Sequence, residues 1–224
     1  GIIAIESSAR ADIKMVMYNA DGSRGAMCGN GVRCAAFFAK KHADVKNNSV
    51  TVETDCGVVS VKLTDIKSRS CTAQAAMPFP REYISSQKVA AALLSAGVKI
   101  DKGDIFAVDV GNKHLVVFGG EKSAEFMAKK AEESGLFVGG VNVERCEETA
   151  RGARAEVYER GSGYTFACGS GAVAAAKALS LRRGGDKFEI IMRGGTLWVT
   201  LTENAAYLKG EVKEVFEGSA DYEI

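Results

Sequence analysis

Two segments of the chain, residues 32–41 and 170–181, are apolar on nearly every side at helical spacing. A helix that is apolar all round is typical of one enclosed by other elements, here by a sheet. Two further helices are expected at residues 87–96 and 124–134, because each segment follows a serine and ends at a glycine. These two helices are predicted to lie at the periphery.

Short segments rich in β-branched residues follow each enclosed helix. They cover residues 50–55, 58–63, 187–193 and 197–201, and a tight glycine turn separates the two members of each pair. This pattern predicts two antiparallel hairpins. A last strand is expected around residues 211–216.

The same pattern occurs twice along the chain. The segment VMYNADGSRGAMCGNG (residues 16–31) runs in step with EVYERGSGYTFACGSG (residues 156–171), with a tyrosine ten residues before each cysteine. Each half reads as strand, glycine-rich loop, Cys-Gly-X-Gly, helix, strand, glycine turn and strand. A repeat of this length indicates two homologous lobes.

The repeat predicts an α+β fold with two pseudo-symmetric lobes, each built on a central helix. The first lobe is expected at residues 1–77 and the second at residues 78–211. The last strand, near residues 211–224, is expected to rejoin the first lobe.

Composition narrows the class of protein. The chain has 224 residues, of which 46% are hydrophobic, enough for one large domain or two small ones. Its 29 basic and 28 acidic residues give a net charge of +1 without a charged block, so neither nucleic acid nor a membrane surface is an expected partner. No Gly-Lys-Ser/Thr ending marks a phosphate loop. Because the chain opens with Gly1 rather than Met, the absence of a targeting segment settles nothing.

The six cysteines are expected to be reduced thiols in a reducing compartment. They are Cys28, Cys34, Cys56, Cys71, Cys146 and Cys168. No Cys-X-X-Cys occurs and there are only two histidines, so neither a zinc site nor any other metal site is expected. Cys34 is expected in the core of its helix, and Cys56, Cys71 and Cys146 are interpreted as structural. His42 is expected to be solvated or to interact with a helix end.

Cys28 and Cys168 each stand directly before a helix. Backbone N–H groups point outward there and the helix dipole favours negative charge, so a thiolate and a bound carboxylate would both be stabilised. Taken singly, each cysteine could be a small buried hydrophobe. As a matched pair in duplicated loops, they are interpreted as catalytic.

Two thiols on opposite sides of one carbon suit the inversion of a stereocentre. One thiolate removes a proton from one face and one thiol delivers a proton to the other. The proton beside a carboxylate is weakly acidic, so the charge that develops on the carboxylate needs preorganised donors. The paired helix N-termini would supply them.

At this point the chain resembles the diaminopimelate epimerase family. The segments NADGSRGAMCGNGVRC and ERGSGYTFACGSGA resemble the two signature segments of the family. VDVGNKHLVVF resembles its Gly-Asn-Pro-His segment, with Lys113 in place of proline, and VNVE resembles its Val-Asn-Val segment. The resemblance implies an epimerase that needs no pyridoxal phosphate or other cofactor and interconverts LL- and meso-diaminopimelate for lysine and cell-wall synthesis. It also implies barrel-like antiparallel sheets around each central helix, a homodimer, and the bacterial cytoplasm or a plastid.

The resemblance also implies a role for each matching residue. Cys28 and Cys168 would be the acid–base pair. The groups that would hold the substrate are Gly29, Asn30, Gly169 and Ser170 for the reacting carboxylate, Glu159 for the reacting amino group, Asn19, Asn142 and Arg160 for the distal end, and Asn112 in the pocket. His114, beside Asn112, either supports the site or fills the core, and both readings stay open.

The chain departs from the family at its start, because members open with about 45 further residues that include a substrate-binding asparagine. An inactive remnant is therefore one alternative. Others are a histidine racemase of the same fold and a proline racemase, although the latter carries an Asp-Arg-Ser-Pro-Cys-type second motif. A thiol redox protein would need a nearby resolving cysteine, which the sequence lacks.

Overall fold

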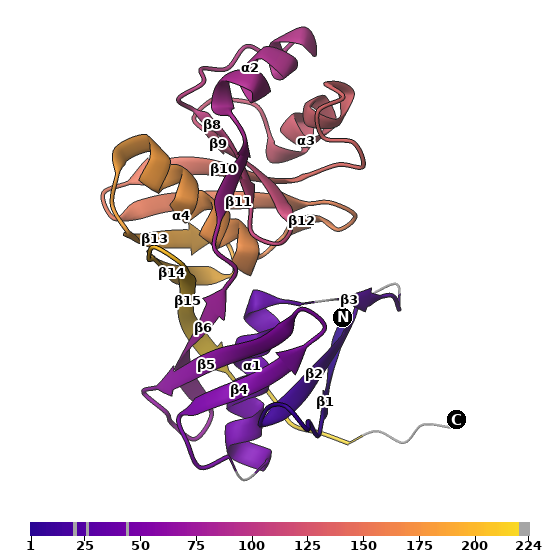
Figure 1. Ribbon diagram of the computed structural model, residues 1–224, viewed down its shortest axis with the longest axis vertical. Coiled ribbons are helices and arrows are strands. Elements are labelled where there is room, and N and C mark those ends of the chain that lie inside the picture. The colour runs from indigo at the N-terminus through magenta and orange to yellow at the C-terminus, as the bar shows by residue number, and fades with distance from the viewer. Residues whose placement is uncertain (20–21, 26, 44, 220–224) are drawn as a thin grey trace. The chain divides into compact units, whose positions relative to one another are not determined.

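The computed structural model describes residues 1–19, 22–25, 27–43 and 45–219, and it divides the chain into two compact units (Figure 1). The first unit comprises Gly1–Met27, Gly31–Ala75 and Gly210–Ile224, and the second comprises Cys28–Asn30 and Ala76–Lys209. The chain therefore crosses between them at the start of the first helix as well as near residues 75 and 209. The lobe boundaries expected from the sequence stay a prediction.

The first unit is a sheet packed on one helix. Its strands are β1 (Ile2–Glu6), β2 (Ile13–Tyr18), β3 (Arg24–Gly25), β4 (Ser49–Thr54), β5 (Gly57–Thr64) and β6 (Ser70–Met77), in the order β1-β2-β4-β5-β6 with β3 on β2. Helix α1 (Gly29–His42) places Val32, Ala36 and Ala39 in a core with Val52 and Leu63. Burial of these apolar side chains is the main force that holds the unit together.

The second unit is a larger sheet with three helices (Figure 1). Its elements are β7 (Arg81–Ile84), α2 (Ser86–Ser95), β8 (Ile105–Asp109), β9 (Lys113–Phe118), α3 (Ala124–Glu133), β10 (Asn142–Thr149), β11 (Gly152–Glu159), β12 (Gly163–Thr165), α4 (Gly169–Arg183), β13 (Lys187–Met192), β14 (Gly195–Leu201) and β15 (Ala206–Lys213). The strand order is β15-β14-β13-β11-β10-β9-β8-β7, with β12 on β11.

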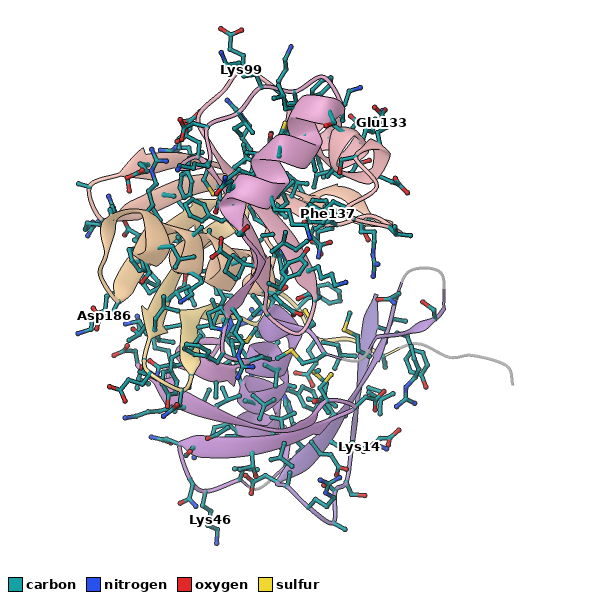
Figure 2. The ribbon with its side chains drawn as sticks, turned by 45° about the horizontal axis from the view of Figure 1, so that its top comes forward. Lys14, Lys46, Lys99, Glu133, Phe137 and Asp186 are labelled. Carbon is teal, nitrogen blue, oxygen red and sulfur yellow. The ribbon has the colours of Figure 1, made fainter. Side chains whose placement is uncertain are left out.

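Helix α4 is the central helix of this unit and is buried along almost its whole length. Its alanine-rich surface lets the backbone approach the sheet, which matches the expectation of an enclosed helix. Helices α2 and α3 instead bury one face each, with Val89, Leu93 and Met127 in a core shared with Leu115. Lys99 and Glu133 point outward from this part, whereas Phe137 lies inside it (Figure 2).

Strand pairing follows the repeat that the sequence predicts. In the first unit β2 pairs in parallel with β4 across α1, and β4 pairs antiparallel with β5. In the second unit β11 pairs in parallel with β13 across α4, and β13 pairs antiparallel with β14. The α+β class and the repeated lobes are confirmed, but the sheets are mixed rather than antiparallel throughout, since a strand–helix–strand crossover gives a parallel pair.

The four helices and both hairpins lie where the sequence places them, within three residues at each end. The last strand is the exception, because it is β15, Ala206–Lys213, rather than residues 211–216. Gly210 lies inside this strand, and an internal glycine reads in sequence as a break. Within the described ranges, no helix is long and apolar enough to cross a membrane.

Candidate active site

Cys168 begins helix α4 as its N-cap residue, with φ −121° and ψ 119°. Its Sγ accepts a hydrogen bond from the Gly171 N–H at 3.4 Å and lies 3.4 Å from the Ser170 Oγ. A thiol thus takes the place that a serine or aspartate side chain usually takes at a helix start. The cap fixes the sulfur at the positive end of the helix.

Cys28 directly precedes helix α1 and is partly buried. With Gly29 and Asn30 it belongs to the second unit, the unit that holds Cys168. The Asn30 Nδ2 donates to the Ala167 carbonyl oxygen at 3.3 Å, so one motif is bonded to the residue before the other cysteine.

The first turns of α1 and α4 lie in direct backbone contact. A Cβ placed on Gly169 would lie 3.3 Å from the Gly29 Cα and 2.9 Å from the Leu208 side chain. A Cβ on Gly29 would lie 3.0 Å from the Met77 Cε. The close approach of the two helix starts therefore favours a glycine at position 169, and side chains pack tightly against Gly29. Both Cys-Gly-X-Gly motifs are brought to one place.

The pKa of Cys168 is raised to about 12, mainly by burial and further by the negative charges of Glu144 and Glu159. Hydrogen bonds from Ser170 and Gly171 act in the opposite direction. The expectation that the helix start stabilises a thiolate, and so lowers this pKa, is therefore wrong for Cys168, because burial outweighs the helix dipole. Cys168 is a protonated thiol at neutral pH.

A buried polar chain leads away from Cys168. The His114 Nε2 lies 3.1 Å from both the Ser170 Oγ and the Asn112 Oδ1, and the His114 Nδ1 lies 2.8 Å from the Glu144 Oε1. His114 and Glu144 are both fully buried. His114 was expected either to support the site or to fill the core. It does both, because it lies within hydrogen-bond distance of Ser170 and is fully buried.

Among the residues of this series of polar contacts, Glu144 is the one that the sequence analysis did not single out. It follows Asn142 on β10, and the parallel register of Asn142 with His114 brings its carboxylate to the histidine. A Cβ on Gly171 would lie 2.5 Å from the Glu144 Oε1, so the second glycine of the motif makes room for this carboxylate. The signal available in the sequence was its spacing, because Glu144 lies two residues after the predicted site residue Asn142 and so on the same face of the strand.

Asn142 and Arg160 are joined to each other. The Asn142 Oδ1 accepts the Arg160 backbone N–H at 2.9 Å, and its Nδ2 donates to the Lys113 carbonyl oxygen at 3.1 Å. The Arg160 guanidinium donates to the Gly139 carbonyl oxygen at 3.3 Å. Asn142 thus holds β11 and β9 on either side of β10, and Arg160 extends from the end of β11.

Glu159 ends β11 beside the loop that leads to Cys168. Its Oε1 accepts the Thr165 hydroxyl at 2.5 Å, and its charge acts on the Cys168 thiol. Asn19 lies in the first unit, in the turn after β2, where its Nδ2 donates to the Ser23 Oγ at 3.0 Å. Every predicted site residue except Asn19 therefore belongs to the second unit.

The other cysteines and His42 have no part in this cluster. Cys71 and Cys146 are buried as expected of structural residues, and Cys56 is exposed. Cys34 is exposed on α1, so the expectation that it lies in the helix core is wrong. His42 is exposed and stacks on Phe38 with ring centroids 4.6 Å apart.

Sequence comparison gives one consistent family. A family model for diaminopimelate epimerase matches residues 1–77 and 106–215. A diaminopimelate epimerase of Caldanaerobacter subterraneus is 36% identical, with 99% of this chain and 85% of the relative covered. One from Desulfovibrio desulfuricans is 33% identical over 97% of this chain and 82% of the relative.

Comparison with solved structures gives the fold. A hydroxyproline epimerase from Agrobacterium vitis matches with a TM-score of 0.62 at 14% identity, covering 95% of this chain and 71% of that one. A phenazine biosynthesis protein of the PhzF family from Bacillus anthracis also matches with a TM-score of 0.62 at 14% identity, covering 95% and 83%. At these identities the match concerns the two-lobe architecture alone.

Proposed function

The chain belongs to the diaminopimelate epimerase family, and on that premise we propose that it interconverts LL- and meso-diaminopimelate by proton transfer between two thiols. It is an isomerase of the epimerase class. The observation that carries the proposal is the contact between the two Cys-Gly-X-Gly helix starts in the second unit.

The reacting carboxylate of the substrate would lie at the two helix starts. Backbone N–H groups of Gly169 and Ser170, and those of Gly29 and Asn30 on the other helix, would face its oxygens. Negative charge develops on these oxygens when the α proton leaves. Donors that are already oriented stabilise this charge without reorganisation, and each helix dipole adds to their effect.

Proton transfer would use the two thiols in opposite roles. In one direction the Cys28 thiolate takes the α proton, and the Cys168 S–H delivers a proton to the opposite face. Cys28 then ends as a thiol and Cys168 as a thiolate. The pKa of about 12 supports Cys168 as the acid of this direction, because the residue holds its proton at neutral pH. The reverse reaction exchanges the roles.

The buried polar residues that extend from Cys168 would position its thiol. The Cys168 Sγ, the Ser170 hydroxyl, the His114 ring and the Glu144 carboxylate form one continuous series of polar contacts. This series would orient the thiol and would connect it to a buried carboxylate.

The two ends of the substrate would be held by different groups. Glu159 would pair with the reacting ammonium group, and Arg160 would bind the distal carboxylate with its planar fork of N–H donors. Asn142 and Asn19 would complete the distal site, and Asn112 would lie in the pocket. A second amino-acid head group suits this set better than an imidazole or a pyrrolidine ring does.

The test is to incubate the protein with LL-diaminopimelate in deuterated water. We expect deuterium at the α carbon together with meso product, and no comparable exchange with L-histidine or L-proline. Exchange with histidine or proline but not with diaminopimelate would contradict the substrate assignment. Absence of exchange with all three would support the inactive remnant.

The resemblance also leads us to propose a homodimer that works in the bacterial cytoplasm or a plastid. The mass of one chain is 23.7 kDa, so the dimer would have about twice this mass. Light scattering coupled to size-exclusion chromatography would measure it directly, and a mass of one chain at micromolar concentration would contradict the dimer.

A further inference from the structure

Strand β11 changes its neighbour along its length. Residues from Gly152 to Arg154 pair with β13, whereas residues from Val157 to Glu159 pair with β12. Ala155 and Glu156 lie between these two stretches. A cavity of about 560 Å³ opens at this point in the second unit, which is a volume typical of small-molecule sites.

The wall of this cavity carries an excess of cationic groups. Arg145, Arg154 and Arg193 line it, together with Glu147 and Glu156. Arg145 lies on β10, Arg154 on β11 and Arg193 just after β13, so three segments direct guanidinium groups to one place. Guanidinium groups bind carboxylates through two parallel hydrogen bonds.

Most of these charged side chains form no ion pair with another described residue. Arg145 and Glu147 lie 3.6 Å apart, but among the described residues Arg154, Arg193 and Glu156 have no ion-pair partner. The register places Glu156 opposite Arg145 and Arg154 opposite Glu147, an arrangement that commonly gives cross-strand ion pairs. These pairs are not formed here.

Two of the arginines have further features that bear on ligand binding. The Arg145 Nε is buried and has no hydrogen-bond partner among the described residues. The Arg193 guanidinium lies 4.7 Å from the centre of the Phe166 ring, which holds its plane by a cation–π contact. The Arg193 guanidinium is therefore oriented before anything binds.

We propose that this cavity binds a small amino dicarboxylate, a molecule with two carboxylates and one ammonium group. The carboxylates meet Arg154 and Arg193, and the ammonium group meets Glu156. A ligand with acidic groups alone would face Glu156 without a compensating charge, whereas Glu147 already lies beside Arg145. The proposal goes beyond the epimerase reaction and does not depend on it.

The cavity is separate from the two cysteines but shares a segment with them. Thr165 lines the cavity and also donates to Glu159, and it lies three residues before Cys168. The next residue, Phe166, accepts a hydrogen bond from the Gly194 N–H at 2.6 Å. A ligand in the cavity therefore contacts the segment that positions the buried thiol.

The experiment is isothermal titration of the protein with L-glutamate, and with glutarate, which has the same two carboxylates but no ammonium group. We expect L-glutamate to bind at one site per chain and glutarate to bind about tenfold more weakly. Arg154→Met and Arg193→Met should each weaken L-glutamate binding by about tenfold or more. Glu156→Gln should remove the preference for L-glutamate over glutarate.

Two control variants locate the bound molecule. Arg151→Met removes an exposed arginine in the turn between β10 and β11, which pairs with Glu189 at 3.1 Å outside the cavity, and this variant should bind as the wild type does. Arg160→Met removes the proposed distal contact of the epimerase substrate and should also leave binding unchanged. The proposal is overturned if millimolar L-glutamate gives no binding heat, if Arg154→Met and Arg193→Met bind like the wild type, or if Arg160→Met abolishes binding.

Discussion

Cys168 lies at the positive end of a helix and is also deeply buried, and these two surroundings act on its pKa in opposite directions. A helix start and its N–H donors stabilise a thiolate by a limited amount, since the effect is confined to the first turn. Burial removes the hydration of the whole negative charge. Burial is the largest cause of the shift here, and two carboxylates add to it.

Alkylation of Cys168 by iodoacetamide should therefore be slow at neutral pH. Only the thiolate reacts, so the rate should rise roughly tenfold for each pH unit up to a pKa of about 12. The rate is measured by mass spectrometry of the peptide that contains Cys168, between pH 7 and 10. A rate that reaches a plateau below pH 9 would contradict the assignment of Cys168 as a thiol at rest.

Glu144→Gln keeps the shape of the buried side chain but removes its charge. The pKa of Cys168 should fall, because the negative charge of Glu144 raises it, and alkylation at pH 8 should become faster. At the same time kcat should fall, because His114 loses its charged partner. Slower alkylation, or unchanged turnover, would show that Glu144 does not act through the chain to Cys168.

Arg160→Lys keeps the positive charge but loses the planar fork. The loss of one charge-assisted hydrogen bond lowers kcat/KM for diaminopimelate by roughly 10- to 150-fold. Because the distal contacts hold the reacting carbon between the thiols, kcat should fall as well. Steady-state kinetics with LL-diaminopimelate measure both constants, and a variant as active as the wild type would remove Arg160 from the distal site.

At the scale of elements, the parallel pair of β11 and β13 depends on one glycine. A Cβ on Gly152 would lie 1.9 Å from the Glu189 carbonyl oxygen, a backbone atom that cannot move without shifting β13. Gly152→Ala should lower the free energy of unfolding by about 3 kcal/mol, as overpacking against backbone does. Urea unfolding measures the change.

Gly218→Ala is the matched control for this substitution, because a Cβ there would meet no atom within 4 Å. Its free energy of unfolding should stay within about 0.5 kcal/mol of the wild type. A Gly152→Ala protein as stable as this control would show that the two strands do not approach as closely as described.

Local sequence patterns predict the elements that depend on local interactions. Cys-Gly-X-Gly before an apolar run gives the starts of α1 and α4, and glycine turns give the hairpins. The carboxylate of Glu144 depends instead on the register between β9 and β10, which no short segment determines. The pKa of Cys168 depends in the same way on burial by distant residues, so the expectation that the helix start lowers it was wrong.

At the scale of the whole molecule, the repeat explains why one unit contains both cysteines. Each half of the chain supplies one helix with a cysteine at its start, and the first residues of α1 belong to the second unit rather than to the unit that holds the rest of the helix. The duplicated motif thereby gives the second unit both cysteines instead of one in each unit. In the proposed mechanism, a single copy of the motif would provide only one proton carrier.

The most direct test of the two-thiol account is turnover by Cys28→Ala and by Cys168→Ala, with Cys56→Ala as the control for loss of an exposed thiol. Each protein is incubated with LL-diaminopimelate in deuterated water, and meso product and α-deuterium are measured together. We expect no meso product from either of the first two variants, because each face loses its proton carrier, and turnover like the wild type from the control. Turnover near the wild-type rate in Cys28→Ala or in Cys168→Ala would contradict the account.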